Sequence, residues 1–179
     1  MKKYTLVMIM ILLFCSSLLF SATFDEEKTK TADGENFLFP ADALRTGPAV
    51  FALTMGKDRD NGEVQQMQVI GWQEHFDNNP TLLGTIPVYH FSVLSGVPFF
   101  VKGTIRGALH KFYADKTDPS RVAVLFVSKT DKFAQQAGFP ADESGTIVVV
   151  ASDGSVAGYV KGEVTSAKVA QLQKVLATL

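Results

Sequence analysis

The chain of 179 residues is long enough for one domain, and its 46% hydrophobic and 20% charged residues suit a globular core and exclude general disorder. The 17 basic and 18 acidic residues leave a net charge of −1, which is too balanced for a nucleic-acid-binding surface. A single cysteine, Cys15, excludes a disulfide within the chain and a cysteine-based zinc cluster.

The first residues have the layout of a secretory signal. Basic residues at positions 2 and 3 precede an apolar run over residues 6–20, and the small residues Ser21 and Ala22 follow it. We expect residues 1–22 to be a signal peptide that is cleaved. The protein is then periplasmic or otherwise extracytoplasmic, in a compartment that permits disulfides.

Two alternatives compete with cleavage. An uncleaved segment would anchor the chain in a membrane through residues 4–20, although the apolar run is shorter than the about 20 residues of a membrane span. A lipoprotein signal would acylate Cys15, but Phe14 stands where such a signal has a small residue. The layout therefore favours cleavage over both.

After the signal, a polar and charged stretch over residues 23–36 is expected to be a flexible lead-in to a domain over residues 37–179. The apolar run over residues 48–55 is typical of a strand that is buried on both faces of a sheet. A helix should begin at Asp60, because Asp60 and Glu63 have the spacing of a capping box. Its predicted apolar face consists of Val64, Met67, Ile70, Trp72 and Phe76.

The remaining expected elements alternate between strands and helices. Pro87 indicates either an edge strand or the start of a strand, and the pair Asp153 and Gly154 is typical of a hairpin turn. Thr165 or Ser166 is expected to cap the last helix. The elements are a strand at 86–94, a helix at 99–113, a strand at 121–128, a short helix at 131–137, strands at 146–152 and 155–161, and a C-terminal helix.

This order predicts an α/β fold with a mixed central sheet, helices on both faces and a helical insert after the second strand. It resembles the thioredoxin-like three-layer sandwich, whose closing hairpin and terminal helix are its most distinctive part. Residues 142–166 and residues 97–103 resemble the bacterial periplasmic thioredoxin-like proteins of the YtfJ type. The helical insert is more weakly similar to the thioredoxin-related assembly factors of mitochondrial ATP synthase.

The residues that carry redox chemistry in the resembled superfamily are missing from this chain. Thioredoxins have Cys-x-x-Cys between the first strand and its helix, where this chain has residues 56–63, and a peroxiredoxin would need a thiolate there. Thioredoxins also have a cis-proline where this chain has Thr146, preceded by Gly145. Thiol–disulfide exchange proceeds through attack by a thiolate, so we expect no such activity from the mature chain.

Two charged segments are the candidate binding residues. The first is a loop at the edge where the resembled fold has its functional groups, and it consists of Lys57, Asp58, Arg59 and Asp60. The second is a basic helix face with i, i+4, i+8 spacing, and it consists of Lys102, Arg106 and His110. This face could dock an acidic partner or lipid headgroups. Both segments also fit an ordinary solvated surface, which is the commoner role of such charges.

The histidines and aromatic residues give weaker indications. His75, His90 and His110 lack the spacing of metal ligands, so we expect no metal site, and no motif indicates a cofactor. A set of aromatic residues around the second strand would mark a binding site if it were exposed, although burial is the default. It consists of Tyr89, Phe91, Phe99 and Phe100.

The sequence thus favours a secreted, redox-inactive, thioredoxin-like domain that acts by binding, as a chaperone or an assembly factor. Its partner would be an envelope protein or a small ligand, with no nucleic acid, and the membrane would be contacted only through an uncleaved N-terminus. The alternative is a thiol-independent or peroxiredoxin-related enzyme with Asp58, Asp60 or His75 converging in a pocket. A thiol enzyme using Cys15 would require that the signal is retained.

Overall fold

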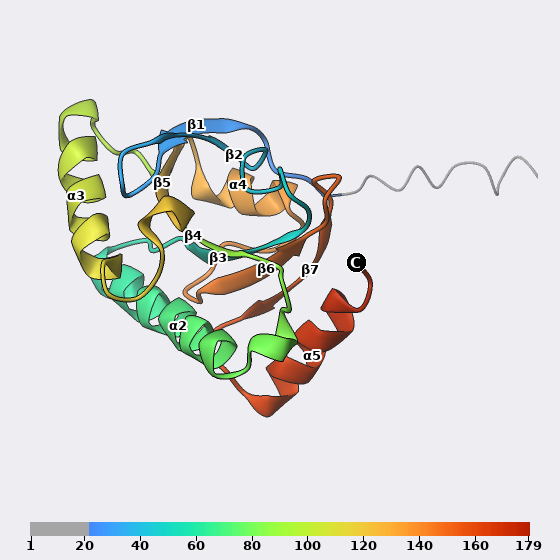
Figure 1. Ribbon diagram of the computed structural model, residues 1–179. Coiled ribbons are helices and arrows are strands. Elements are labelled where there is room, and N and C mark those ends of the chain that lie inside the picture. The colour runs from blue at the N-terminus through green and yellow to red at the C-terminus, as the bar shows by residue number, and fades with distance from the viewer. Residues whose placement is uncertain (1–21) are drawn as a thin grey trace, which may run out of the picture.

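A five-stranded mixed sheet forms the centre of the computed structural model, which describes residues 22–179 (Figure 1). The strands lie in the order β5–β4–β3–β6–β7. Strands β3, β4 and β5 are parallel to one another, β6 runs antiparallel to β3, and β7 runs antiparallel to β6. Their bounds are β3 Ala49–Thr54, β4 Val88–Ser95, β5 Val122–Val127, β6 Thr146–Val150 and β7 Val156–Lys161. The predicted signal and Cys15 lie outside the described residues, apart from Ala22.

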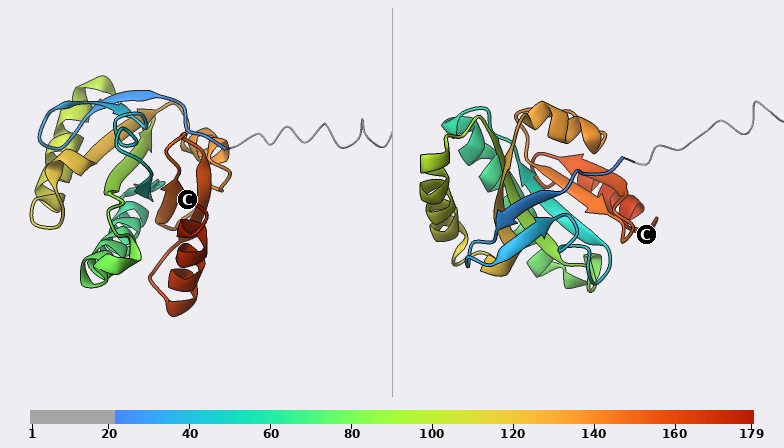
Figure 2. Two further views of the ribbon diagram at one scale, coloured as in Figure 1. Left: turned by 45° about the vertical axis from the view of Figure 1, so that its right-hand side comes forward. Right: turned by 90° about the horizontal axis from the view of Figure 1, so that it is seen from above.

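Each face of this sheet is covered by a different layer (Figure 2). Three helices pack on one face: α2 (Arg59–Asn78), α3 (Lys102–Tyr113) and α5 (Ser166–Leu176). Helix α4 (Thr130–Gln136) packs on the other face together with a two-stranded hairpin of β1 (Glu27–Lys30) and β2 (Asn36–Phe39). Both faces of β3 are therefore buried, as its apolar run predicted. The α/β sandwich with helices on both faces is confirmed.

The lead-in expected over residues 23–36 is instead packed structure. It contains β1 and a buried Phe24, whose ring lies 5.3 Å from that of Phe39 and 5.0 Å from that of Phe133. The hydroxyl of Thr29 is buried and donates to the carbonyl of Val124 at 2.7 Å. The error has a physical reason: β1 has the sequence EKTK, and a strand that buries so little apolar surface gives no hydrophobic pattern.

The N-cap of helix α2 lies two residues earlier than expected, and the buried face includes the predicted Ile70, Trp72 and Phe76 but not the other two residues of the predicted apolar face. Asp58, not Asp60, is the N-cap, and its Oδ1 accepts from the Asn61 amide at 2.9 Å. The buried face has the i, i+4, i+7, i+11 spacing of Gln65, Val69, Trp72 and Phe76. Val64 and Met67, which we assigned to the core, lie off this stripe and are 53% and 64% exposed.

The other predicted elements are present, with shifts of at most three residues at their ends. Pro87 precedes β4, which pairs with β3 and β5 on its two sides, so it marks a strand start and not a sheet edge. Thr165 caps α5, as expected. Short 3₁₀ helices, which we did not predict, occur at Pro80–Leu82, Phe99–Val101 and Pro119–Arg121. No helix within residues 22–179 combines the length and the apolar character that crossing a membrane requires.

Candidate functional site

The edge at which β3, β4 and β5 end is where the resemblance places the functional groups of this fold. The parallel pairing brings the carboxyl ends of the three strands to this edge. Because β6 is antiparallel, its first residue, Thr146, lies at the same edge, paired with Leu53. The N-terminus of α2 and the loop over residues 140–145 therefore meet beside each other here.

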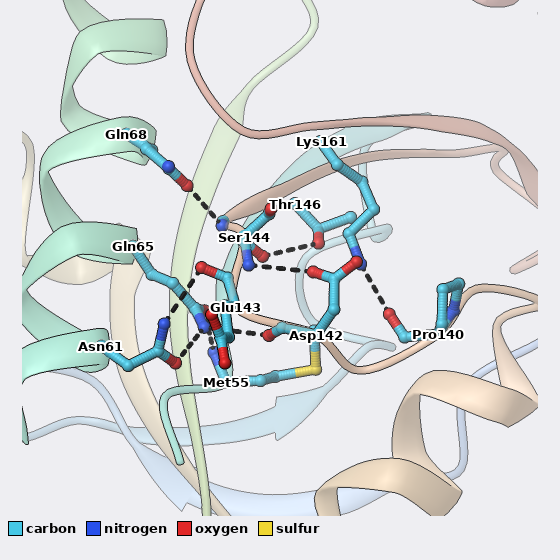
Figure 3. Close-up of polar contacts among 11 residues, drawn as sticks. Met55, Asn61, Gln65, Gln68, Pro140, Asp142, Glu143, Ser144, Thr146 and Lys161 are labelled. Carbon is cyan, nitrogen blue, oxygen red and sulfur yellow. Dashed lines mark hydrogen bonds and ion pairs between the residues drawn. The ribbon is translucent and has the colours of Figure 1, made fainter. Parts of the chain in front are cut away.

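Three amide side chains of α2 hold that loop, and we call Asn61, Gln65 and Gln68 the amide clamp (Figure 3). The Gln65 side chain is fully buried. Its Nε2 donates to the carbonyl of Asp142 at 3.2 Å, and its Oε1 accepts from the amide of Met55 at 2.6 Å. Gln65 thus links helix α2 both to the residue after β3 and to the loop before β6.

The two outer members of the amide clamp bind the loop on either side of Gln65 (Figure 3). Asn61 Nδ2 donates to the carbonyl of Glu143 at 3.1 Å, and Gln68 Oε1 accepts from the amide of Gly145 at 2.7 Å. Backbone groups that would otherwise be open to a ligand are thereby satisfied by side chains. The amide clamp therefore fixes the shape of this edge. Its amide side chains are not nucleophiles.

Gly145 permits the close approach of the loop to α2. A Cβ at this position would lie 2.9 Å from the backbone oxygen of Gln65 and 3.0 Å from Val69 Cγ1. Neither neighbour can move freely, because one is helix backbone and the other is a core side chain. Gly145 therefore serves the contact between the loop and α2.

An ion pair closes the far side of the same loop (Figure 3). Lys161 Nζ lies 2.8 Å from Asp142 Oδ2 and donates to the carbonyl of Pro140 at 2.6 Å. Partial burial pushes the pKa of Asp142 upward, but hydrogen bonds from Lys161 and Ser144 together hold that pKa below its usual value. Asp142 is therefore a charged structural group at neutral pH.

A surface groove lies beside the amide clamp, between α2 and the segment that joins β7 to α5. Its volume is about 580 Å³. Exposed apolar side chains, Val64 and Met67, line it together with three carboxylates and no cationic side chain. We call it the α2 groove, and its lining consists of Asp60, Glu63, Val64, Met67, Gln68, Gly71, Glu163 and Val164. Gln68 belongs to both the groove and the clamp.

The structure separates the four charged loop residues that we selected from the sequence. Asp58 caps α2, and Arg59 pairs with Glu63 at 2.8 Å on the exposed surface. Lys57 lines a different hollow, next to α4. Of the four, Asp60 alone lines the α2 groove.

The basic face predicted for α3 is divided in the same way. Lys102 Nζ lies 4.7 Å from the centre of the Phe126 ring, and the Arg106 guanidinium lies 5.2 Å from it, so both side chains pack along the edge strand β5. His110 is exposed. At 3.6 residues per turn, position i+8 lies about 80° around the helix from position i, and this drift explains the split.

The aromatic set is also divided. Phe91 is buried and Tyr89 is half-buried in the core cluster under the hairpin. Phe99 and Phe100 instead lie on the surface, 89% and 81% exposed.

The histidines do not assemble a reactive centre. His90 is buried, and its Nε2 lies 2.9 Å from Gln73 Oε1, while burial lowers the pKa of His90 to about 4. His75 lies about 22 Å along α2 from Asp60, so Asp58, Asp60 and His75 do not converge in one pocket. Residues 22–179 contain no group of three or more His, Asp or Glu side chains placed to hold a metal ion.

Sequence reasoning missed the amide clamp and the apolar part of the α2 groove. The spacing of Asn61, Gln65 and Gln68 was visible, since residues at i, i+4 and i+7 share a helix face. Gln65 and Val69 also mark the buried stripe that would have placed Val64 and Met67 outside the core. The backbone partners in the loop were not visible, because they lie 77 or more residues away along the chain.

Comparison with known proteins identifies the fold. No protein-family model and no curated protein sequence matches this chain. Copper-bound ScoI of Arabidopsis thaliana has a TM-score of 0.55 at 8% identity, with 88% of this chain and 100% of that chain covered. A reduced 2-Cys peroxiredoxin of Plasmodium vivax has a TM-score of 0.52 at 12% identity, covering 88% and 93%. At such identities the likeness concerns the fold alone, and the chain has a thioredoxin-like fold.

Proposed function

We propose that this chain is a redox-inactive, thioredoxin-like domain that acts outside the cytoplasm by holding a segment of a partner protein in the α2 groove. The observation that carries the proposal is the groove itself. Two large apolar side chains, Val64 and Met67, stand more than half exposed among three carboxylates, at the functional edge of the fold. Isolated exposed apolar residues are common, but two that line one concave surface favour a binding role.

The chemistry of this edge supports binding over thiol exchange. Residues 22–179 contain no cysteine, and the exchange reaction needs a thiolate. The amide clamp lies next to the positions where the resemblance places Cys-x-x-Cys and the cis-proline, and it fixes one side of the groove through Gln68. A fixed wall lowers the entropic cost of docking a ligand.

The charge of the groove indicates the kind of partner. Asp60, Glu63 and Glu163 surround the apolar side chains, so the matching segment would carry apolar residues flanked by Lys or Arg. The proposal places the protein with chaperones or assembly factors of the cell envelope. This assignment agrees with the resemblance to YtfJ-type periplasmic proteins and, more weakly, to the ATP synthase assembly factors, and with the predicted signal peptide.

The test is site-specific photo-crosslinking in cells with p-benzoylphenylalanine at position 67. We expect a discrete cross-linked product that disappears with Glu63→Lys combined with Glu163→Lys, because the reversed charges repel a basic segment. The matched control is Glu74→Lys, an exposed charge reversal on α2 outside the groove, which should leave the product unchanged. A product that survives the double reversal, or that forms equally from position 174 on α5, would contradict the proposal.

A further inference from the structure

The turn between β4 and α3 presents two adjacent phenylalanines to solvent. Phe99 and Phe100 are 89% and 81% exposed, more than any other large hydrophobic side chain among residues 22–179. Large aromatic rings contribute most when they are buried, so a pair left in water at one point is unusual for a free surface. This pair, with Pro98 and Val101 on either side, is the Phe99–Phe100 tip.

The tip is a fixed projection. The 3₁₀ helix Phe99–Val101 is closed by bonds from Val101 N to the Pro98 carbonyl at 3.2 Å and from Lys102 N to the Phe99 carbonyl. Neither ring is paired with another ring in the described part of the chain, and neither lines the α2 groove or the hollow next to α4. Both rings therefore project from the surface into solvent.

The segment around the tip contains basic residues and no acidic residue. Residues 96–114 include Lys102, Arg106, His110 and Lys111 and no acidic residue, although the whole chain has a net charge of −1. Lys102 and Arg106 extend beside Phe126, close to the start of α3, where the tip lies. The next acidic residue, Asp115, follows the opposite end of that helix.

We propose that the Phe99–Phe100 tip inserts into the interface of an anionic lipid bilayer, while Lys102 and Arg106 contact the headgroups. Aromatic side chains next to basic residues are the composition of interfacial membrane contacts, and each basic residue near an anionic surface adds to the attraction. A second copy of this chain is disfavoured as the occupant, because a symmetric contact would bring two cationic α3 helices together.

This contact is separate from any contact through the N-terminus. The amide of Val156 donates to the carbonyl of Ala22, so the described chain begins at the edge of the sheet where β7 starts. The tip lies at the opposite edge, where β4 ends. A readout at the tip therefore distinguishes the two.

The experiment places tryptophan at the tip of the full chain with Phe100→Trp, and uses vesicles of phosphatidylcholine and phosphatidylglycerol with brominated acyl chains. We expect a blue shift and quenching from position 100, and neither from Lys174→Trp, an exposed position on α5. The parent chain gives the background of Trp72, which is buried and should stay unquenched. Absence of quenching at position 100 would overturn the proposal. A blue shift of the fluorescence from position 100 that occurs only when an envelope protein is added would overturn it as well.

A separate set of measurements tests whether electrostatic attraction to anionic lipid contributes to binding. In the Phe100→Trp chain, Lys102→Glu should weaken partitioning onto the anionic vesicles roughly fivefold or more. Added salt and vesicles of pure phosphatidylcholine should weaken it similarly. Quenching that is insensitive to all three changes would overturn the assignment to anionic lipid.

Discussion

His90 should make the stability of this protein fall as the pH drops from neutral toward 4. Its imidazole is buried, burial lowers the pKa of His90 from 6.5 to about 4, and its ring lies 5.1 Å from that of Tyr113. Below pH 6.5 the unfolded chain takes up a proton at His90 while the folded chain does not. Unfolding is therefore favoured increasingly as the pH falls through this window, and no further loss comes from His90 below pH 4.

The difference between the two pKa values gives the size of the effect. As the pH falls from neutral to below 4, His90 lowers the free energy of unfolding by about 3 kcal/mol in all, of which about 2 kcal/mol is lost by pH 5. Asp142, Asp118 and Asp153 have their pKa below the usual value, so their contributions are lost at more acidic pH. The interval above pH 5 therefore reports mainly on His90.

The assay is urea unfolding at about pH 7.5 and about pH 5 for the parent chain and for His90→Gln. The variant starts from a different stability, but its loss between the two pH values should be smaller by about 2 kcal/mol. His110→Gln, at an exposed position, is the control and should keep the parental loss. Equal losses in the parent and in His90→Gln would refute the reasoning.

Three further substitutions test the packing of the site and core. Gln65→Leu should lower the unfolding free energy by roughly 2–3 kcal/mol in urea, because it leaves the buried amide of Met55 without its partner; no change would contradict the role of the amide clamp. Gly56→Ala should lower it by about 2 kcal/mol, because its Cβ would lie 2.5 Å from the Gly62 Cα; a neutral result in thermal unfolding would show that the loop relaxes freely. Trp72→Phe should cost about 1–2 kcal/mol through loss of the indole hydrogen bond to a buried backbone carbonyl, and an unchanged urea midpoint would argue against that bond.

The sequence predicted the parts of the fold that depend on local pattern. Residues 48–55 and 146–152 are apolar runs bounded by turn residues, and both are central strands. The pair Asp153 and Gly154 marks the hairpin turn, where Gly154 has φ +87°, a value that favours glycine. Hydrophobic period and turn chemistry were enough there.

The parts that depend on contacts distant along the chain were not predictable in the same way. Strand β1 is polar, and its Thr29, like Phe24 shortly before it, contacts residues about a hundred positions away. The amide clamp likewise consists of ordinary glutamine and asparagine side chains, whose backbone partners only the fold supplies. The sequence indicated charged residues such as Arg59 as candidate binding residues, whereas the groove depends on the exposed apolar pair Val64 and Met67.

The central claim is that this thioredoxin-like domain acts through the α2 groove without thiol chemistry. Cross-linking from position 67 in a chain that also carries Cys15→Ser tests it most directly. We predict the same cross-linked product as in the chain with Cys15, resistant to reducing agent and lost when Glu63 and Glu163 are replaced by lysine. A product that requires Cys15, or that persists after both charge reversals, would contradict the claim.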